Sequence, residues 1–337
     1  MVASAKLHKA QGRIENMLPY QRKLNEILTN FLSTDVTVES PYTNERPVER
    51  IAIVAFSSNS SLCGAFNSNV AKMLERTLED YKSLGRENIL IYPVGKKVEE
   101  AVRKLGYEPQ GSYQEMADKP SYVQAYELAG LLMKEFLEER IDKVELIYHH
   151  FKSTGSQVLT RDKYLPINLE KVAEEATEAI VEKSRFNNDY IVEPSAARLI
   201  AELLPKVLSQ KIYTVLLDSN TSEHAARMLA MQAATDNANE LIQDLTKQYN
   251  KSRQQAITNE LLDISGIKAS FVLTEYENKI YMSARSIDEV NVQIIAEKLG
   301  GGGHINSAGA QFDHTNMHEA VSALKETIDK MIEEGDI

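Results

Sequence analysis

The chain has 337 residues, of which 43% are hydrophobic and 26% are charged, and its formal net charge is −11 at pH 7. This acidic balance argues against bulk binding to nucleic acid or to an anionic membrane surface. The single cysteine excludes an internal disulfide, and neither a signal peptide nor an apolar stretch of membrane-spanning length is recognisable. We therefore expect a soluble intracellular protein of two or three domains.

The first segment of the chain is predicted to be a helix over residues 1–32. Apolar residues recur there at mixed three- and four-residue spacings, although Gly12 and Pro19 should weaken or kink the helix. Residues 33–50, which contain Pro41 and Pro47, indicate a loop that leads into a new domain.

The central segment alternates between predicted strands and helices. Strands are expected at 51–56, 89–94, 144–151 and 158–167, and helices at 65–84, 96–105 and 122–139. This alternation predicts a mostly parallel sheet flanked by helices, a Rossmann-like α/β domain over residues 50–190. The acidic segment 168–188 is only loosely periodic, and it is interpreted as a mobile helix or loop.

A very long helix is predicted over residues 195–264, because no glycine or proline occurs from Lys206 to Ile264. It would span roughly 70 residues and about 105 Å at 1.5 Å rise per residue. A domain of this size cannot bury such a helix along its whole length. Its apolar stripe approximates the coiled-coil period, so an antiparallel pair with the helix 1–32 is the simplest way to cover both stripes.

A separate small α+β module is predicted over residues 265–337. A hairpin of strands 267–274 and 279–286 is followed by a helix over 290–299, a strand at 310–312 and a helix over 318–333. Four consecutive glycines and His304 follow the first of these helices. The glycine N–H groups can line an anion site, and His304 and Arg285 can bind a phosphate. A flexible glycine turn with an incidental histidine explains the spacing equally well.

The remaining motifs favour structural roles. The turn after the strand 51–56 lacks a dinucleotide-binding or Walker pattern, so we interpret it as a tight turn capped by serine and asparagine side chains. Cys63 is expected to be a small buried residue. His149 and His150 should point to opposite faces of a strand, which is poor geometry for joint metal binding. We predict no catalytic residue, no metal site and no cofactor.

Residues 1–264 closely resemble the gamma subunit of the bacterial F-type ATP synthase. The segments that carry this resemblance are 1–7, 62–67, 150–153, 190–194, 249–254 and, most specifically, Glu223-His224-Ala225-Ala226-Arg227-Met228 with Ala234-Thr235-Asp236-Asn237-Ala238. The resemblance implies a rotor shaft: an antiparallel coiled coil inside a ring of alpha and beta subunits, attached to an α/β domain.

The resemblance also implies partners and a location. The partners are the alpha, beta and epsilon subunits and the membrane c-ring, and the chain would be peripheral, at the cytoplasmic face of the bacterial inner membrane. The candidate contacts with the ring are polar residues of the long helix: Arg227, Asp236, Asn237, Lys251 and Arg253.

Residues 265–337 resemble the DHH-associated C-terminal domain of the DHH phosphoesterases, closest to the cyclic-di-AMP phosphodiesterases. The segments 269–272, 283–286, 291–293 and 300–304 carry the resemblance. It implies a nucleotide-binding domain whose ligand is a cyclic dinucleotide or another phosphate compound. The residues that would face the phosphate are Arg285, Gly301, Gly302, Gly303 and His304.

Both resemblances show departures. The chain contains no Asp-His-His motif, it starts inside the first helix of the gamma family, and Asn59 and Ser61 stand where that family usually has Asp and Gly. Both families share a stretch like Glu260–Ile264, where the switch falls, so we predict a chimeric chain. Its expected function is a rotor-stalk subunit with an appended, catalytically incomplete nucleotide-binding domain. The alternative is a phosphodiesterase or a cyclic-dinucleotide-binding protein that acts through the C-terminal module.

Overall fold

The computed structural model describes residues 2–32, 40–167, 195–262, 266–276, 279–287, 290–313 and 315–335. The chain divides into two compact units, Met1–Thr235 (unit 1) and Asp236–Ile337 (unit 2), which are described separately. The acidic segment 168–188 lies outside the described residues. The four domain ranges expected from the sequence, 1–32, 50–190, 195–264 and 265–337, stay predictions.

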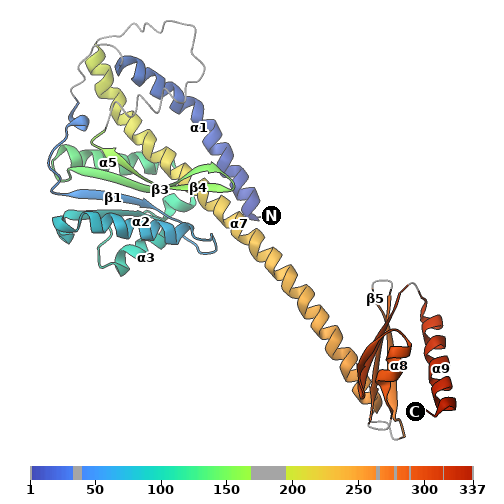
Figure 1. Cartoon of the computed structure of the whole chain (residues 1–337). Helices are drawn as coiled ribbons and strands as arrows, with labels where there is room; N and C mark the ends of the chain where they lie inside the picture. The colour runs from blue at the N-terminus through green and yellow to red at the C-terminus, as the bar shows by residue number, and fades with distance from the viewer. Residues whose placement is uncertain are drawn as a thin grey trace. The chain divides into compact units, whose positions relative to one another are not determined.

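Unit 1 is built on a four-stranded sheet in the order β2-β1-β3-β4 (Figure 1). The central strand β1 pairs in parallel with both β2 and β3, whereas β3 and β4 are antiparallel. The bounds of these strands are β1 Ile51–Phe56, β2 Ile89–Val94, β3 Lys143–Ser153 and β4 Ser156–Leu165. All six residues of β1 are buried, which explains its uninterrupted apolar sequence.

Helices cover both faces of this sheet. Ile51, Ile53 and Ala55 of β1 pack against α2 and α3, and the alternating residues Ala52, Val54 and Phe56 pack into the cluster that includes α4, α5 and α7. This division follows from the two-residue period of a strand. The bounds of these shorter helices are α2 Phe66–Asp80, α3 Lys96–Lys104, α4 Gln114–Asp118 and α5 Tyr122–Leu137. Short 3₁₀ turns occur at Pro41–Thr43, Lys82–Leu84 and Arg86–Asn88.

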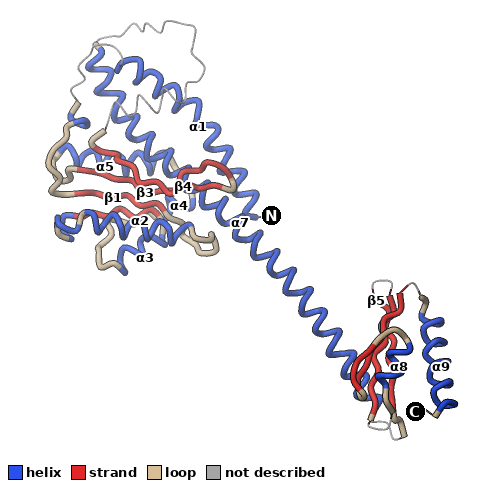
Figure 2. The backbone as a smooth tube through the Cα atoms, viewed as in Figure 1, coloured by secondary structure: helices blue, strands red, loops and turns tan. Residues whose placement is uncertain are grey.

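Unit 1 also contains the helix α1 and the part of the helix α7 up to Thr235. Helix α1, Val2–Leu32, continues through Pro19, and α7, Ala196–Leu262, runs for 67 residues and contains Pro205. The expectation of one very long helix is confirmed. Figure 2 shows α1 beside the N-terminal half of α7, and Leu24 and Leu28 of α1 share a buried cluster with residues of α7. The part of α7 that belongs to unit 1 is largely buried up to Ala225.

Unit 2 contains a fully antiparallel sheet in the order β5-β6-β8-β7. The bounds of its elements are β5 Ala269–Tyr276, β6 Lys279–Ser286, α8 Val292–Lys298, β7 Gly302–His304, β8 Ser307–Asp313 and α9 Met317–Glu334. Met282, Ala284, Ala308 and Ala310 form a buried core with residues of α8 and α9. Because side chains alternate, this core uses one face of the sheet, and the other face carries Arg285 and Ser307.

Strand β7 differs from the loop that the sequence predicts for the glycine run. A Cβ atom at Gly301 would lie 2.0 Å from the carbonyl oxygen of Gly309, and one at Gly303 would lie 2.4 Å from that of Ser307. Two of the four glycines therefore permit a close approach to β8. The glycine run has a structural cause in addition to any role in binding.

Helix α9 begins with a capping box. The side chain of Asn316 accepts a hydrogen bond from the N–H of Glu319, whose carboxylate accepts one from the N–H of Asn316. Among the residues that the structure describes, no helix combines the length and apolar character needed to cross a membrane.

Candidate functional site

The turn after β1 is held by its own polar side chains. The Asn67 side chain accepts a 3.0 Å hydrogen bond from the N–H of Ser58, and the Ser58 hydroxyl donates to the carbonyl oxygen of Ser60 at 2.6 Å. Asn59 bridges this turn to two neighbours: its amide nitrogen donates to the carbonyl oxygen of Gln114, and its amide oxygen accepts from the N–H of Lys96. The prediction of a turn capped by serine and asparagine is confirmed, as is the burial of Cys63 beneath it.

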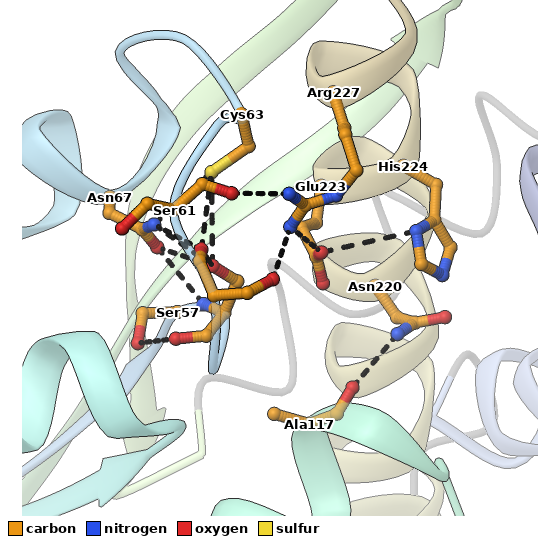
Figure 3. Close-up of polar contacts among 11 residues, drawn as sticks. Ser57, Ser61, Cys63, Asn67, Ala117, Asn220, Glu223, His224 and Arg227 are labelled. Atoms are coloured by element: carbon orange, nitrogen blue, oxygen red, sulfur yellow. Dashed lines mark hydrogen bonds and ion pairs between the residues drawn. The ribbon is translucent and has the colours of Figure 1, made fainter. Parts of the chain in front are cut away.

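Helix α7 is fixed to this turn by an arginine. The Nη2 atom of Arg227 forms a 2.5 Å ion pair with Oε1 of Glu223 and donates a 2.8 Å hydrogen bond to the hydroxyl of Ser60 (Figure 3). Its Nη1 atom donates to the carbonyl oxygen of Ser61. Only 17% of the Arg227 side chain and 10% of the Glu223 side chain are exposed. This cluster of Ser60, Ser61, Glu223 and Arg227 is called the arginine clamp below.

Two further hydrogen bonds tie the preceding turn of α7 to unit 1. The Asn220 side chain donates to the carbonyl oxygen of Ala117 at 2.9 Å, and the Ser222 hydroxyl donates to that of His149 at 3.1 Å. The acceptors of these two hydrogen bonds are backbone oxygens. Because the acceptors belong to the backbone, these contacts fix the position of the helix whatever side chains the acceptor residues carry.

The two neighbouring histidines of β3 have opposite environments, as the strand period predicts. His149 is buried, stacks on Phe66 with a ring centroid distance of 4.4 Å, and burial lowers its pKa to about 4. His150 is partly exposed, and its Nδ1 atom lies 2.7 Å from Oδ2 of Asp218, a hydrogen bond that raises the His150 pKa. Within the described residues, no group of three or more potential ligand side chains could hold a metal ion.

The residues predicted to contact a surrounding ring fall into two groups. Arg227 lies in the arginine clamp of unit 1, with its guanidinium engaged inside the chain. Asp236, Asn237, Lys251 and Arg253 lie on exposed positions of the part of α7 that belongs to unit 2. The same part of the helix exposes large apolar side chains, among them Leu241, Leu245 and Tyr249.

The residues predicted to bind a phosphate are brought together on the sheet of unit 2. In the strand register Arg285 of β6 is opposite Ser307 of β8, and Ser307 is opposite His304 of β7. Directly opposed residues share a face of a sheet and lie about 4.5–5.5 Å apart between Cβ atoms. Arg285, Ser307 and His304 therefore form one row across three strands, called the phosphate row below.

The glycines differ in their relation to this row. Gly302 is on the same face as His304, and a Cβ atom there would meet nothing within 4 Å, whereas Gly301 and Gly303 pack tightly on β8. Ser307 is a residue that the sequence reasoning missed. The signal that could have found it is its place three residues after His304, the spacing of a tight hairpin between β7 and β8.

Comparisons with known proteins match this chain to two families, and the two matches overlap on helix α7. The model of the ATP synthase family matches residues 1–269, and the model of the DHHA1 domain matches residues 237–333. A gamma chain of ATP synthase from Bacteroides fragilis is 72% identical over 266 residues, covering 79% of this chain and 90% of the relative. One from Bacteroides thetaiotaomicron is 67% identical over 269 residues with the same coverage.

The similar solved structures include the central stalk and c-ring of the Tetrahymena thermophila mitochondrial ATP synthase. The likeness has a TM-score of 0.48 and 22% identity, and it covers 70% of this chain and 96% of that one.

The chain therefore belongs to the ATP synthase gamma chain family and carries a DHHA1 domain after its gamma-like part. The two family models overlap over residues 237–269, which include most of the unit 2 part of α7 and the switch expected at Glu260–Ile264. Both family models therefore match residues 237–262 of α7.

Proposed function

We propose that this chain is the central rotor-stalk subunit of a bacterial F-type ATP synthase, coupling proton translocation to ATP synthesis, with an appended and catalytically incomplete nucleotide-binding domain. The observation that carries the proposal is the 72% identity to a gamma chain across 90% of that relative. The family model that matches residues 1–269 supports the same assignment.

In this role the chain transmits torque and performs no chemistry itself. A rotating shaft must not slip against the domain that drives it, and the arginine clamp with Asn220 and Ser222 supplies that attachment in unit 1. Helices α1 and α7 would form the antiparallel coiled coil of the stalk. Their shared burial of Leu24 and Leu28 supports this pairing.

The proposed partners are the alpha, beta and epsilon subunits and the membrane c-ring, at the cytoplasmic face of the inner membrane. Asp236, Asn237, Lys251 and Arg253 would contact the alpha and beta subunits, and their exposure supports this role. Arg227 is proposed as a further contact with these subunits, although its guanidinium is engaged in the arginine clamp.

The C-terminal domain is proposed to bind a cyclic dinucleotide or another phosphate compound at the phosphate row. Arg285 would supply paired donors to phosphate oxygens, with His304 as a further donor and the glycine segment 301–303 beside it. The alternative function is a DHH-type phosphodiesterase or cyclic-dinucleotide-binding protein that acts through this domain. The convergence of Arg285, Ser307 and His304 in one row is the observation that favours it.

Two experiments test these proposals separately. Pull-down of the full chain with alpha and beta subunits should recover a complex, and failure to recover one would contradict the rotor role. Titration with cyclic-di-AMP and manganese should show binding without turnover, weakened by Arg285→Ala. Turnover would contradict the catalytically incomplete domain and favour the phosphodiesterase.

A further inference from the structure

A cavity of about 650 Å³ in unit 1 is used by none of the functions above. Its lining residues come from α1, the hairpin of β3 and β4, and the N-terminal half of α7. Figure 1 shows how these elements are arranged. This volume is within the range of sites for small organic molecules, about 300–1,000 Å³.

The helices α1 and α7 each contribute one face to the wall of this cavity. Lys211, Thr214, Val215 and Asp218 of α7 are spaced by three, four and seven residues, so they share one helix face. Ile14 and Met17 of α1, with Phe151, Val215 and Leu217, give the cavity an apolar wall. The rest of the lining is mostly polar or charged, so groups that can orient a ligand are present.

The charged side chains around the cavity differ in how fully their charges are already paired within the chain. Two ion pairs of the Arg161 guanidinium go to carboxylates outside the cavity, at 2.7 Å to Glu145 and 2.5 Å to Asp80. Lys211 lies 3.0 Å from Asp162. These two cations thus already have carboxylate partners inside the chain, and the partner found for Asp218 among the described residues is His150, a weak base.

Asp218 also keeps acceptor capacity. Its Oδ2 atom contacts His150, whereas no hydrogen bond to its Oδ1 atom is found among the described residues. A carboxylate has about four lone-pair sites, so it can accept further donors. Beside it, the Thr214 hydroxyl is buried without a hydrogen-bond partner in the described part of the chain, an unusual state for a buried polar atom.

We propose that this cavity is a binding site for a small amphiphilic organic cation, a compound with an apolar body and one ammonium group. The apolar body packs on Ile14, Met17 and Val215, and the ammonium group donates to the carboxylate of Asp218 and to the Thr214 hydroxyl. A neutral or anionic compound of the same shape lacks this attraction, and an anion meets the carboxylates of Glu15, Asp162 and Asp218.

Binding should depend on pH through His150, which competes for Asp218 when it is protonated. The charged groups that face this pair are Lys211 of α7, Arg161 and Asp162 of β4, and Glu15 of α1. His150 is a histidine of the cavity lining, and its hydrogen bond with Asp218 raises its pKa. Lowering the pH through its pKa therefore weakens binding of the cation.

The test uses the full chain and three probes of matched shape: phenethylammonium, 2-phenylethanol and phenylacetate. Dissociation constants are measured by NMR titration at pH 8. The cation should bind roughly tenfold or more tightly than the alcohol, as expected for a hydrogen bond to a charged group. Absence of saturable binding, or equal affinities for cation and alcohol, would overturn the proposal.

Variants locate the site. Asp218→Asn should weaken phenethylammonium about tenfold, and Glu75→Gln, an equal charge change on exposed α2, should leave it unchanged. Thr214→Leu fills the cavity without changing any charge and should abolish binding. This variant keeps the test usable if Asp218→Asn does not fold. His150→Gln should remove the pH dependence. Unaltered binding by Thr214→Leu would place the ligand elsewhere and overturn the proposal.

Discussion

Glu223 and Arg227 lie one turn apart on α7, and the 2.5 Å ion pair between them turns the guanidinium toward Ser60 and Ser61 of the turn after β1. The pair therefore acts across two elements more than 160 residues apart in the chain. A helix-surface ion pair is ordinarily worth only a few tenths of a kcal/mol, whereas this one is largely shielded from water and also fixes two groups of the turn.

Replacing Arg227 with alanine should lower the free energy of unfolding of unit 1 by about 1–3 kcal/mol, because Glu223 and the Ser61 carbonyl oxygen lose their donor in a partly buried place. Urea unfolding followed by hydrogen exchange in 217–228 measures the loss. Arg253→Ala, on an exposed position, is the matched control and should change stability little. Equal effects of the two variants would contradict the clamp.

The ion pair between His150 and Asp218 should stabilise unit 1 mainly in acid. The pair raises the His150 pKa in the folded chain, so its contribution is complete below the unfolded pKa of about 6.5 and is lost as pH rises through the folded value. The stability difference between the native chain and His150→Gln should therefore shrink as the pH rises from about 6 to about 8.5, roughly the range of histidine titration. A stability difference that grows as the pH rises would contradict this prediction.

His149 should act in the opposite direction. Burial lowers its pKa to about 4, so the folded chain resists protonation there and loses stability as pH falls from the unfolded value of about 6.5 toward 4. His149→Phe keeps a ring against Phe66 and removes the titration. Its urea midpoint should fall less than that of the native chain over this pH range. Parallel decreases in the two proteins would show that other groups cause the acid sensitivity.

Two glycines of β7 provide a matched pair. Gly303 has φ +154° and a Cβ there would meet the backbone of β8, so Gly303→Ala should destabilise unit 2 by roughly 1–3 kcal/mol. Gly302 faces open space, and Gly302→Ala should cost less than about 1 kcal/mol. Thermal unfolding of the two variants measures the difference. Equal changes in stability for the two variants would contradict the close approach of β7 to β8.

The apolar side chains exposed on α7 in unit 2 should make the isolated chain associate or fray there. Leu241 is 60% exposed and Tyr249 is 65% exposed, and a stripe of this kind is covered only by a partner. Leu241→Glu with Leu245→Glu should reduce self-association in sedimentation velocity. Strong hydrogen-exchange protection of 241–262 in a dilute monomer would contradict this expectation.

Several elements follow from sequence pattern alone. Strands β1, β2 and β6 begin and end where their apolar or alternating runs do, and α7 follows from the lack of glycine and proline after Lys206. Other elements could not be found this way. Helix α4 has five residues, too few for a helical period to show, and β7 consists mainly of glycines, which have no side-chain pattern.

The sequence by itself determined the family of the chain, its long helix and the presence of a second family's domain, because each depends on local pattern or on runs of matching residues. Only the tertiary structure decided which polar groups meet. Arg227 reaches the turn after β1, Asp218 reaches His150, and Arg285 is opposite Ser307, although none of these pairings is local in sequence. The physical reason is that such contacts depend on strand register and helix rotation, which are set by packing of the whole unit.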